Sequence, residues 1–261
     1  STSTGTIFGQ RGSSTSTTMH ETIDRMTDQL AQALTTITPT TQDVMEHSVA
    51  FSPIRWKTGW PHHLRRVPPF RDDAHATITR AEVFEFAADV HASGYNRDQI
   101  IDFLGAAFAY RSGQTNQVMQ MQQFLRNKNN AAQLLAAIRK LEGIFGDGAG
   151  DGAARGGAGD GTADVEPAVE AYELLTATGL PPRFASAVAY FLAGVQGTGE
   201  SDKPVIICKT RAEVAGLEPS GEWSGAEYGE YLARLRAARD DYDTSLPLDA
   251  VEYAAREFAD R

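Results

Sequence analysis

Residues 178–214 constrain the fold of this chain more than any other segment. A helical pattern ends at a glycine, the chain turns through Gly179-Leu180-Pro181-Pro182, and a second helical pattern opens with Arg183-Phe184-Ala185-Ser186. Glycine favours the backbone of such a turn, and proline is accepted in the first turn of a helix. The pattern predicts two helices joined by a tight hairpin, and a structure of this kind is well suited to bind a phosphate backbone. A short apolar run follows and ends in Cys208-Lys209.

Helical signals recur along the rest of the chain, and no segment shows convincing strand alternation. Capping boxes begin helices at Thr79 and Ser224, and Asn96 begins another. Apolar spacing and helix boundaries predict further helices at residues 20–37, 114–127, 130–145, 164–177, 182–194 and 248–258. Residues 50–74, rich in Trp, Pro and basic side chains, are expected to form an ordered irregular segment. The fold class is therefore mainly α, with few or no strands.

Two segments fall outside this helical pattern. Residues 1–18 are rich in Ser and Thr, and we expect them to be disordered. Residues 146–161 are dominated by Gly and Asp, and their composition favours a flexible insertion. The insertion lacks the Gly-Lys-Ser/Thr sequence of a phosphate-binding loop. The remainder, residues 19–261, is expected to form one helical domain.

Composition limits the class of protein. The single cysteine, Cys208, rules out an intramolecular disulfide framework and a zinc cluster, so we expect no metal and no cofactor. No apolar run approaches the roughly 20 residues that span a bilayer, and we expect a cytoplasmic monomer that does not engage a membrane. The net charge of −10 counts against nucleic-acid binding. Basic residues nevertheless cluster at 55–71 and 126–140, which is compatible with an acidic exterior around a basic groove.

The order of these signals resembles the helix-hairpin-helix DNA glycosylase superfamily, specifically its prokaryotic branch with the 8-oxoguanine glycosylase (OGG) fold. The matching residues are 56–60, 109–113, 179–191, 204–215, 223, 228–232 and 251–253. The resemblance covers about residues 50–261. It implies a two-lobed helical domain that bends double-stranded DNA and flips a nucleotide into a pocket between the lobes, because the glycosidic bond is inaccessible in the base stack.

The resemblance also implies which residues contact DNA. In the family, hairpin amides and the N-terminus of the following helix bind a phosphate near the flipped nucleotide. We expect DNA contacts from the hairpin region and from the basic segments, at Gly179, Arg183, Ser186, Arg211, Arg65, Arg66 and Lys57. Aromatic candidates for the base pocket are Trp56, Trp60 and Tyr110, and the alternative role for the two tryptophans is to anchor the core.

The catalytic positions depart from the family pattern. Bifunctional members use a Lys beside the hairpin as the nucleophile and an Asp further along to stabilise positive charge on the sugar. These positions hold Arg183 and Lys209 here, and an arginine, always protonated, cannot be that nucleophile. Three accounts remain open. Lys209 acts as a relocated nucleophile or electrostatic group, a carboxylate such as Asp202 or Glu213 serves, or the fold has lost catalysis and kept binding.

The leading hypothesis is a DNA-binding protein that excises a modified or damaged base by base flipping and N-glycosidic hydrolysis, in repair or antiviral defence. The alternative is a non-catalytic protein that binds DNA or a partner on the same fold. A third interpretation is a helical protein with no nucleic-acid role.

Overall fold

The computed structural model describes residues 29–146, 166–207, 209–218 and 220–261. It is mainly α-helical, as predicted, with one small two-stranded sheet in these ranges. The Ser/Thr-rich segment 1–18 and nearly all of the Gly-rich segment 146–161 lie outside the described residues. None of the helices described is long and apolar enough to cross a membrane.

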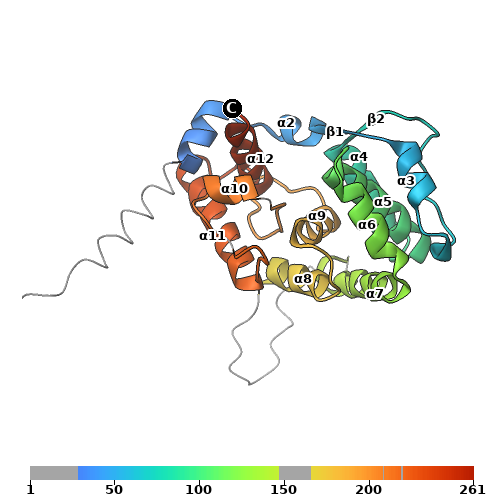
Figure 1. Cartoon of the computed structure of the whole chain (residues 1–261). Coiled ribbons are helices and arrows are strands. Elements are labelled where there is room, and N and C mark those ends of the chain that lie inside the picture. Colours follow the sequence, from blue (N-terminus) through green and yellow to red (C-terminus); the bar gives the residue numbers. More distant parts are fainter. Residues whose placement is uncertain (1–28, 147–165, 208, 219) are drawn as a thin grey trace, which may run out of the picture.

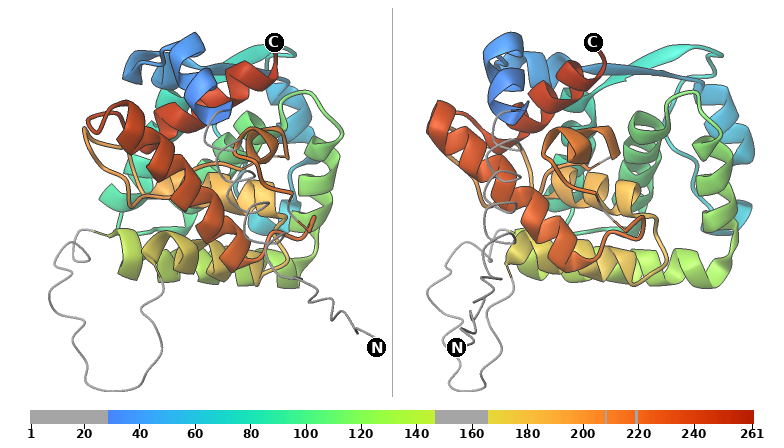
Figure 2. Two further views of the ribbon diagram at one scale, coloured as in Figure 1. Left: turned by 90° about the vertical axis from the view of Figure 1, so that its left-hand side faces the viewer. Right: turned by 60° about the vertical axis from the view of Figure 1, so that its left-hand side comes forward.

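The helices form two groups on either side of α9 (Pro182–Leu192), as Figure 1 shows. On one side lie α3 (Pro53–Gly59), α4 (Arg80–Ala92), α5 (Arg97–Ser112) and α6 (Gln117–Arg126). On the other side lie α10 (Lys209–Val214), α11 (Gly225–Tyr242) and α12 (Leu248–Ala259). α7 (Lys128–Phe145) and α8 (Pro167–Thr176) run along the bottom of that view, and α2 (Thr41–Glu46) contacts both α4 and α12. Residues 29–37 are also helical. α11 extends from α12 to α8 and contacts both (Figure 2).

Two helices make up the centre of the core. Every residue of α5 from 100 to 110 is buried, and so is every residue of α9 from 184 to 192. A helix that is buried all round must be enclosed by other elements, and α5 is packed against α4, α6, α9 and β1 (Ser48–Phe51). The ends of these two rigid helices therefore offer fixed positions for side chains.

The predicted helix starts are confirmed by their caps. The Thr79 hydroxyl accepts a hydrogen bond from the Glu82 N–H at 3.1 Å and begins α4. Ser224 and Glu227 form a reciprocal capping box at the start of α11. The Asn96 side chain accepts from the N–H of Asp98 at 2.9 Å and begins α5. Each cap satisfies an amide that the first helical turn leaves without an intrahelical partner.

The segment expected to be irregular is partly regular. β1 pairs antiparallel with β2 (Ala76–Thr79), with Ser48 opposite Thr79. The segment of chain that connects the two strands contains α3 and a short 3-10 helix, η1 (His62–Leu64). Strands of four residues are too short to show a clear alternation, and their pairing is not local in sequence. Trp56 and Trp60 pack in this segment with ring centroids 6.3 Å apart.

α8 and α9 are joined by a tight turn through residues 177–181. Gly179 has φ +88°, in the left-handed region that glycine enters without strain. Its N–H donates to the Thr176 carbonyl at 3.0 Å, and the Leu180 N–H donates to the Thr178 hydroxyl at 3.4 Å. The next two residues are prolines, which carry no N–H. The turn therefore presents few amide donors to a ligand.

The apolar run, residues 204–207, is buried and is held by side chains instead of a neighbouring strand. The Tyr228 hydroxyl donates to the Val205 carbonyl at 2.8 Å and accepts from the Val205 N–H at 3.0 Å. The Tyr231 hydroxyl donates to the Ile206 carbonyl at 2.9 Å. The Ser186 hydroxyl accepts from the Ile207 N–H at 3.0 Å. α11 and α9 together fix the segment that leads into α10.

Candidate DNA-binding and active site

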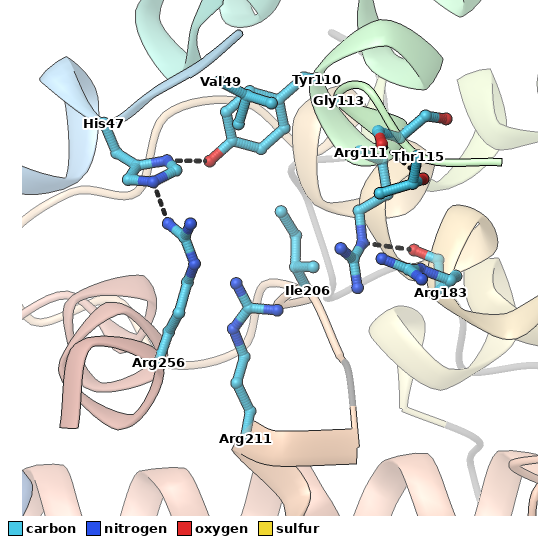
Figure 3. Close-up of a pocket in the computed structure, with 11 residues that line it drawn as sticks. His47, Val49, Tyr110, Arg111, Gly113, Thr115, Arg183, Ile206, Arg211 and Arg256 are labelled. Atoms are coloured by element: carbon cyan, nitrogen blue, oxygen red, sulfur yellow. Dashed lines mark hydrogen bonds between the residues drawn. The ribbon is translucent and has the colours of Figure 1, made fainter. Parts of the chain in front are cut away.

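A pocket of about 210 Å³ opens where α5, β1, α9, α10 and α12 converge (Figure 3). Four arginines line it: Arg111, Arg183, Arg211 and Arg256. His47, Tyr110 and Ile206 also contribute to its walls. We call this space the arginine pocket. No Asp, Glu or Lys lines it within the described part of the chain.

Arg111 lies at the C-terminal end of α5, just before Gly113, whose positive φ of 56° ends the helix. Its Nε donates to the Arg183 carbonyl at 3.3 Å, and Nη2 donates to the Ile207 carbonyl at 2.8 Å. One guanidinium thus joins the end of α5, the first turn of α9 and the apolar run. This linkage fixes the distance between two sides of the pocket.

Arg211 comes from α10 and is anchored by a buried carboxylate. Its Nε lies 2.6 Å from Glu252 Oε1, and the other carboxylate oxygen of Glu252 lies 2.8 Å from Arg80 Nη1. Burial alone would raise the pKa of Glu252, but the charges of Arg211 and Arg80 outweigh burial and hold the pKa below its ordinary value. Glu252 is therefore ionised and serves as the shared counterion of two arginines.

His47 lies between the pocket wall and α12. Its Nδ1 is 2.7 Å from the Tyr110 hydroxyl, and its Nε2 is hydrogen-bonded to the Arg256 guanidinium. Because a guanidinium can only donate, Nε2 is the acceptor and Nδ1 carries the proton of the neutral ring. Burial, together with the positive charges of Arg256 and Arg80, lowers the pKa of His47 to about 3. The ring is neutral at physiological pH and positions Arg256 without adding charge.

The structure brings three of the predicted site residues into the pocket: Arg183, Arg211 and Tyr110. Ser186 does not line the pocket; its hydroxyl accepts a hydrogen bond from the Ile207 N–H at the end of the apolar run. Gly179 forms the turn before α9, and its N–H is already bonded within the turn. The pocket is therefore built on the segment that the sequence singles out, but side chains supply most of its polar groups.

Other predicted residues do not line the pocket. Trp56 and Trp60 are core residues, 0% and 3% exposed. Lys57 pairs with Asp72, and Arg66 makes two hydrogen bonds, of 2.9 and 2.7 Å, to the carboxylate of Asp102. Arg65 is exposed and follows η1 with a φ of 55°. These basic residues form part of the surface near α3 and the start of α5.

The predicted catalytic residues are not assembled around a visible reaction centre. Asp202 and Glu213 are exposed and do not line the arginine pocket. Lys209 is the first residue of α10, between the pocket residues Ile206 and Arg211. Its side chain, like Cys208, lies outside the described part of the chain. The catalytic roles of these residues stay predictions. Among the residues described, no group of three or more His, Cys, Asp or Glu side chains could hold a metal ion.

Sequence reasoning missed much of the polar network around the pocket: His47, Arg80, Arg111, Glu252 and Arg256. Glu252 has the clearest signal, because it is a carboxylate within the apolar stretch of α12. Arg111 follows Tyr110 in a segment that the sequence singles out. His47 and Arg256 have no local signal, since only the fold brings them together.

The family relationship that the hairpin segment and the helical fold suggest is confirmed by a family model. A family model described as "Putative 8-oxoguanine DNA glycosylase OGG-like protein" matches residues 42–153 and 158–256. The chain belongs to this OGG-like family. Every residue that lines the arginine pocket falls within the two matched ranges. No curated protein and no solved structure gives a match to this OGG-like chain. The resemblance read from the sequence is confirmed, and with it a DNA-glycosylase-like, mainly α fold.

Proposed function

We propose that this OGG-like protein binds double-stranded DNA, flips out a modified or damaged nucleotide and hydrolyses its N-glycosidic bond, in DNA repair or antiviral defence. The convergence of four arginines on one pocket carries the proposal, because it places positive charge where the two groups of helices meet. Family membership supports the same conclusion. A base in the stack must be extruded before its glycosidic bond can be reached, and a recessed pocket suits that step.

The contacts to the DNA backbone would come mainly from side chains. The turn before α9 contains two prolines, and the N–H groups of Gly179 and Leu180 are bonded internally. Arg183, in the first turn of α9, lines the pocket and can supply the charge that hairpin amides supply in the family pattern. A guanidinium matches phosphate oxygens in two-point contacts.

The chemistry is assigned to the segment around the start of α10. Lys209 directly follows the apolar run and Cys208 in the sequence and is the first residue of α10. A neutral lysine amine would attack the sugar C1′ and break the N-glycosidic bond, so that the base leaves with a proton, and water would then hydrolyse the imine that forms between the lysine and the opened sugar. Asp202 and Glu213 are the candidate carboxylates that would stabilise positive charge developing on the sugar.

The test is base release from duplex oligonucleotides that each carry one modified base, beginning with 8-oxoguanine, against the unmodified duplex. Alkali reveals abasic sites, and borohydride trapping reports an amine nucleophile. We expect Lys209→Ala to reduce release about 100-fold or more, while Asp241→Asn, an exposed control on α11, leaves it unchanged. Asp202→Asn and Glu213→Gln distinguish the two carboxylates. Wild-type rates in Lys209→Ala would remove Lys209 from the mechanism.

A second function is favoured by one observation. The pocket lining contains neither a carboxylate nor a lysine among the residues that the structure describes. A protein that holds a flipped nucleotide without cleaving it would need only the arginines. Binding of the modified duplexes without base release from any of them would favour this non-catalytic role. A gel-shift series against salt that shows no binding at low ionic strength would reject both functions.

A further inference from the structure

The hydroxyl of Tyr110 accepts hydrogen bonds from two sides. Arg80 Nε donates to it at 2.8 Å, and His47 Nδ1, which carries the proton of the neutral ring, donates at 2.7 Å. Both lone pairs of the phenolic oxygen are therefore occupied. The hydroxyl proton must be donated to a third group, and the described residues supply no acceptor for it. Tyr110 is thus a hydrogen-bond donor that lacks an acceptor.

The open side of this hydroxyl is the arginine pocket. Tyr110 lines the pocket although it is only 5% exposed, and Figure 3 shows its hydroxyl beside the His47 ring. Arg80 is fully buried and does not line the pocket, so it reaches the oxygen from the core. Ser112 also lines the pocket, and its buried hydroxyl has no hydrogen-bond partner. Because buried polar groups are nearly always hydrogen-bonded, these two hydroxyls indicate a polar ligand.

Breaking an N-glycosidic bond calls for a proton at the base. The electron pair of the bond moves to the base, so a positioned proton donor speeds its departure. Among the described residues that line the pocket, Tyr110 is best suited to this role. The arginines stay protonated, and the proton of His47 is directed at Tyr110. The aliphatic hydroxyls of Ser112 and Thr115 are far weaker acids than a phenol, and Thr115 already donates to the Ser112 carbonyl at 2.7 Å.

We propose that Tyr110 is the general acid that protonates the departing base. The inference rests on the proposed function, and it holds whether Lys209 or water attacks the sugar. As the bond between C1′ and the base breaks, its electron pair passes to the base, and the base takes the hydroxyl proton. The phenolate then takes the proton that the attacking lysine or water loses once its bond to C1′ has formed. Tyr110 therefore returns to its starting state.

The surroundings of the hydroxyl suit this transfer. Arg80 places a positive charge and an N–H against the oxygen, and both stabilise the phenolate while it lasts. His47 adds a second N–H without adding charge. The titratable and charged groups around the hydroxyl are Arg80 from α4, His47 from the segment before β1, Arg211 from α10, and Glu252 and Arg256 from α12.

The role of Tyr110 can be tested through the pH dependence of base release. A general acid acts only while it is protonated, so the rate of release from the modified duplexes should fall at high pH. Tyr110→3-fluorotyrosine keeps the hydroxyl and its hydrogen bonds but makes the phenol more acidic, and it should move this fall to lower pH. Tyr110→3,5-difluorotyrosine should move it further. Tyr110→Phe should lower the maximal rate about 100-fold or more and remove the fall.

Tyr190→Phe is the matched control. The Tyr190 hydroxyl also accepts from Arg80, at 3.3 Å, but it is fully buried and does not line the pocket. This variant should keep the pH at which release falls. Near-ultraviolet circular dichroism and gel shifts check that each variant keeps its packing and its affinity for DNA, and the fluorinated variants carry the test if Tyr110→Phe does not fold.

Two results would separate this role from the proposed function. If the protein releases a base but the fall occurs at the same pH in the wild type and in both fluorinated variants, Tyr110 is not the general acid and base excision stands. If the wild type releases no base from any duplex, the proposed function is overturned and the role of Tyr110 with it.

Discussion

Arg80 and Glu252 form an ion pair in which neither side chain is exposed to solvent, with Nη1 and Oε2 2.8 Å apart. The two residues are 172 positions apart in the sequence and belong to α4 and α12. The pair therefore joins the two groups of helices that flank α9. Arg80 also donates to the hydroxyls of Tyr110, at 2.8 Å, and Tyr190, at 3.3 Å. These bonds give the buried guanidinium several acceptors within the core.

Breaking this pair should destabilise the protein strongly. Glu252→Gln leaves Arg80 and Arg211 without their shared counterion, and we expect a loss of about 3–5 kcal/mol in the free energy of unfolding. Replacing both partners of the pair, in Arg80→Met/Glu252→Met, should cost less than the sum of the single variants because fewer charges stay buried. Urea unfolding measures each value. A loss below about 1 kcal/mol in Glu252→Gln would contradict this account.

Asp249 should make stability depend on pH between about 4 and 6. Burial raises its pKa from 3.8 to about 6, although the Tyr190 hydroxyl donates to the carboxylate at 2.7 Å. The folded state therefore holds a proton that the unfolded state has already released. This contribution is fully present below about pH 4, falls as pH rises to about 6, and is then constant, with a total on the order of 3 kcal/mol.

Asp249→Asn removes this titration. The difference in unfolding free energy between wild type and Asp249→Asn should therefore decrease from pH 4 to pH 6 and stay level above it. Denaturant titrations at a series of pH values measure the difference directly. A difference independent of pH, or one that grows with pH, would show that the buried carboxyl does not titrate as described.

The two tyrosines of α11 should control the order of the apolar run. Tyr228→Phe leaves both the N–H and the carbonyl of Val205 without their hydroxyl partner, whereas Tyr231→Phe affects one carbonyl. Each unpaired buried group costs about 1–3 kcal/mol, so Tyr228→Phe should be the more destabilising change. Hydrogen exchange at the Val205 amide should accelerate in Tyr228→Phe and much less in Tyr231→Phe. Equal exchange in the two variants would show that the hydroxyl of Tyr228 does not protect this amide.

Two neighbouring arginines should behave differently. Arg66 is committed to the carboxylate of Asp102, which is 4% exposed, and Arg65 is exposed. Arg66→Gln should mainly lower the free energy of unfolding. If Arg65 contacts a phosphate, Arg65→Gln should weaken DNA binding and reduce the slope of log affinity against log salt by about 0.9. An unchanged slope in Arg65→Gln would exclude that contact.

Local signals predict much of this fold. The capping residues Thr79, Asn96 and Ser224 begin α4, α5 and α11, and each acts through bonds that span only two or three residues. The turn at Gly179 is likewise a local backbone requirement. Such features can be read from the sequence because their energetic cause lies within a few neighbouring residues.

Features that depend on distant contacts could not be predicted in the same way. The two short strands pair only because the intervening segment folds back, and their four-residue patterns carry little information. The pocket has the same property, because His47 lies between α2 and β1, whereas Arg111 and Arg256 come from α5 and α12. Arg183 and Arg211 were identified from their place around the hairpin, but the sequence does not reveal that other arginines join them.

The contrast between an acidic chain and an arginine-lined pocket has a consequence for how DNA would arrive. The net charge of −10 repels a polyanion at long range, whereas the pocket attracts it at short range. Most encounters with DNA would therefore not lead to binding. Only encounters in which the pocket faces the DNA would succeed, and this selection would precede any contact with a base. Because salt screens the long-range repulsion first, the rate of encounter would pass through a maximum at intermediate ionic strength.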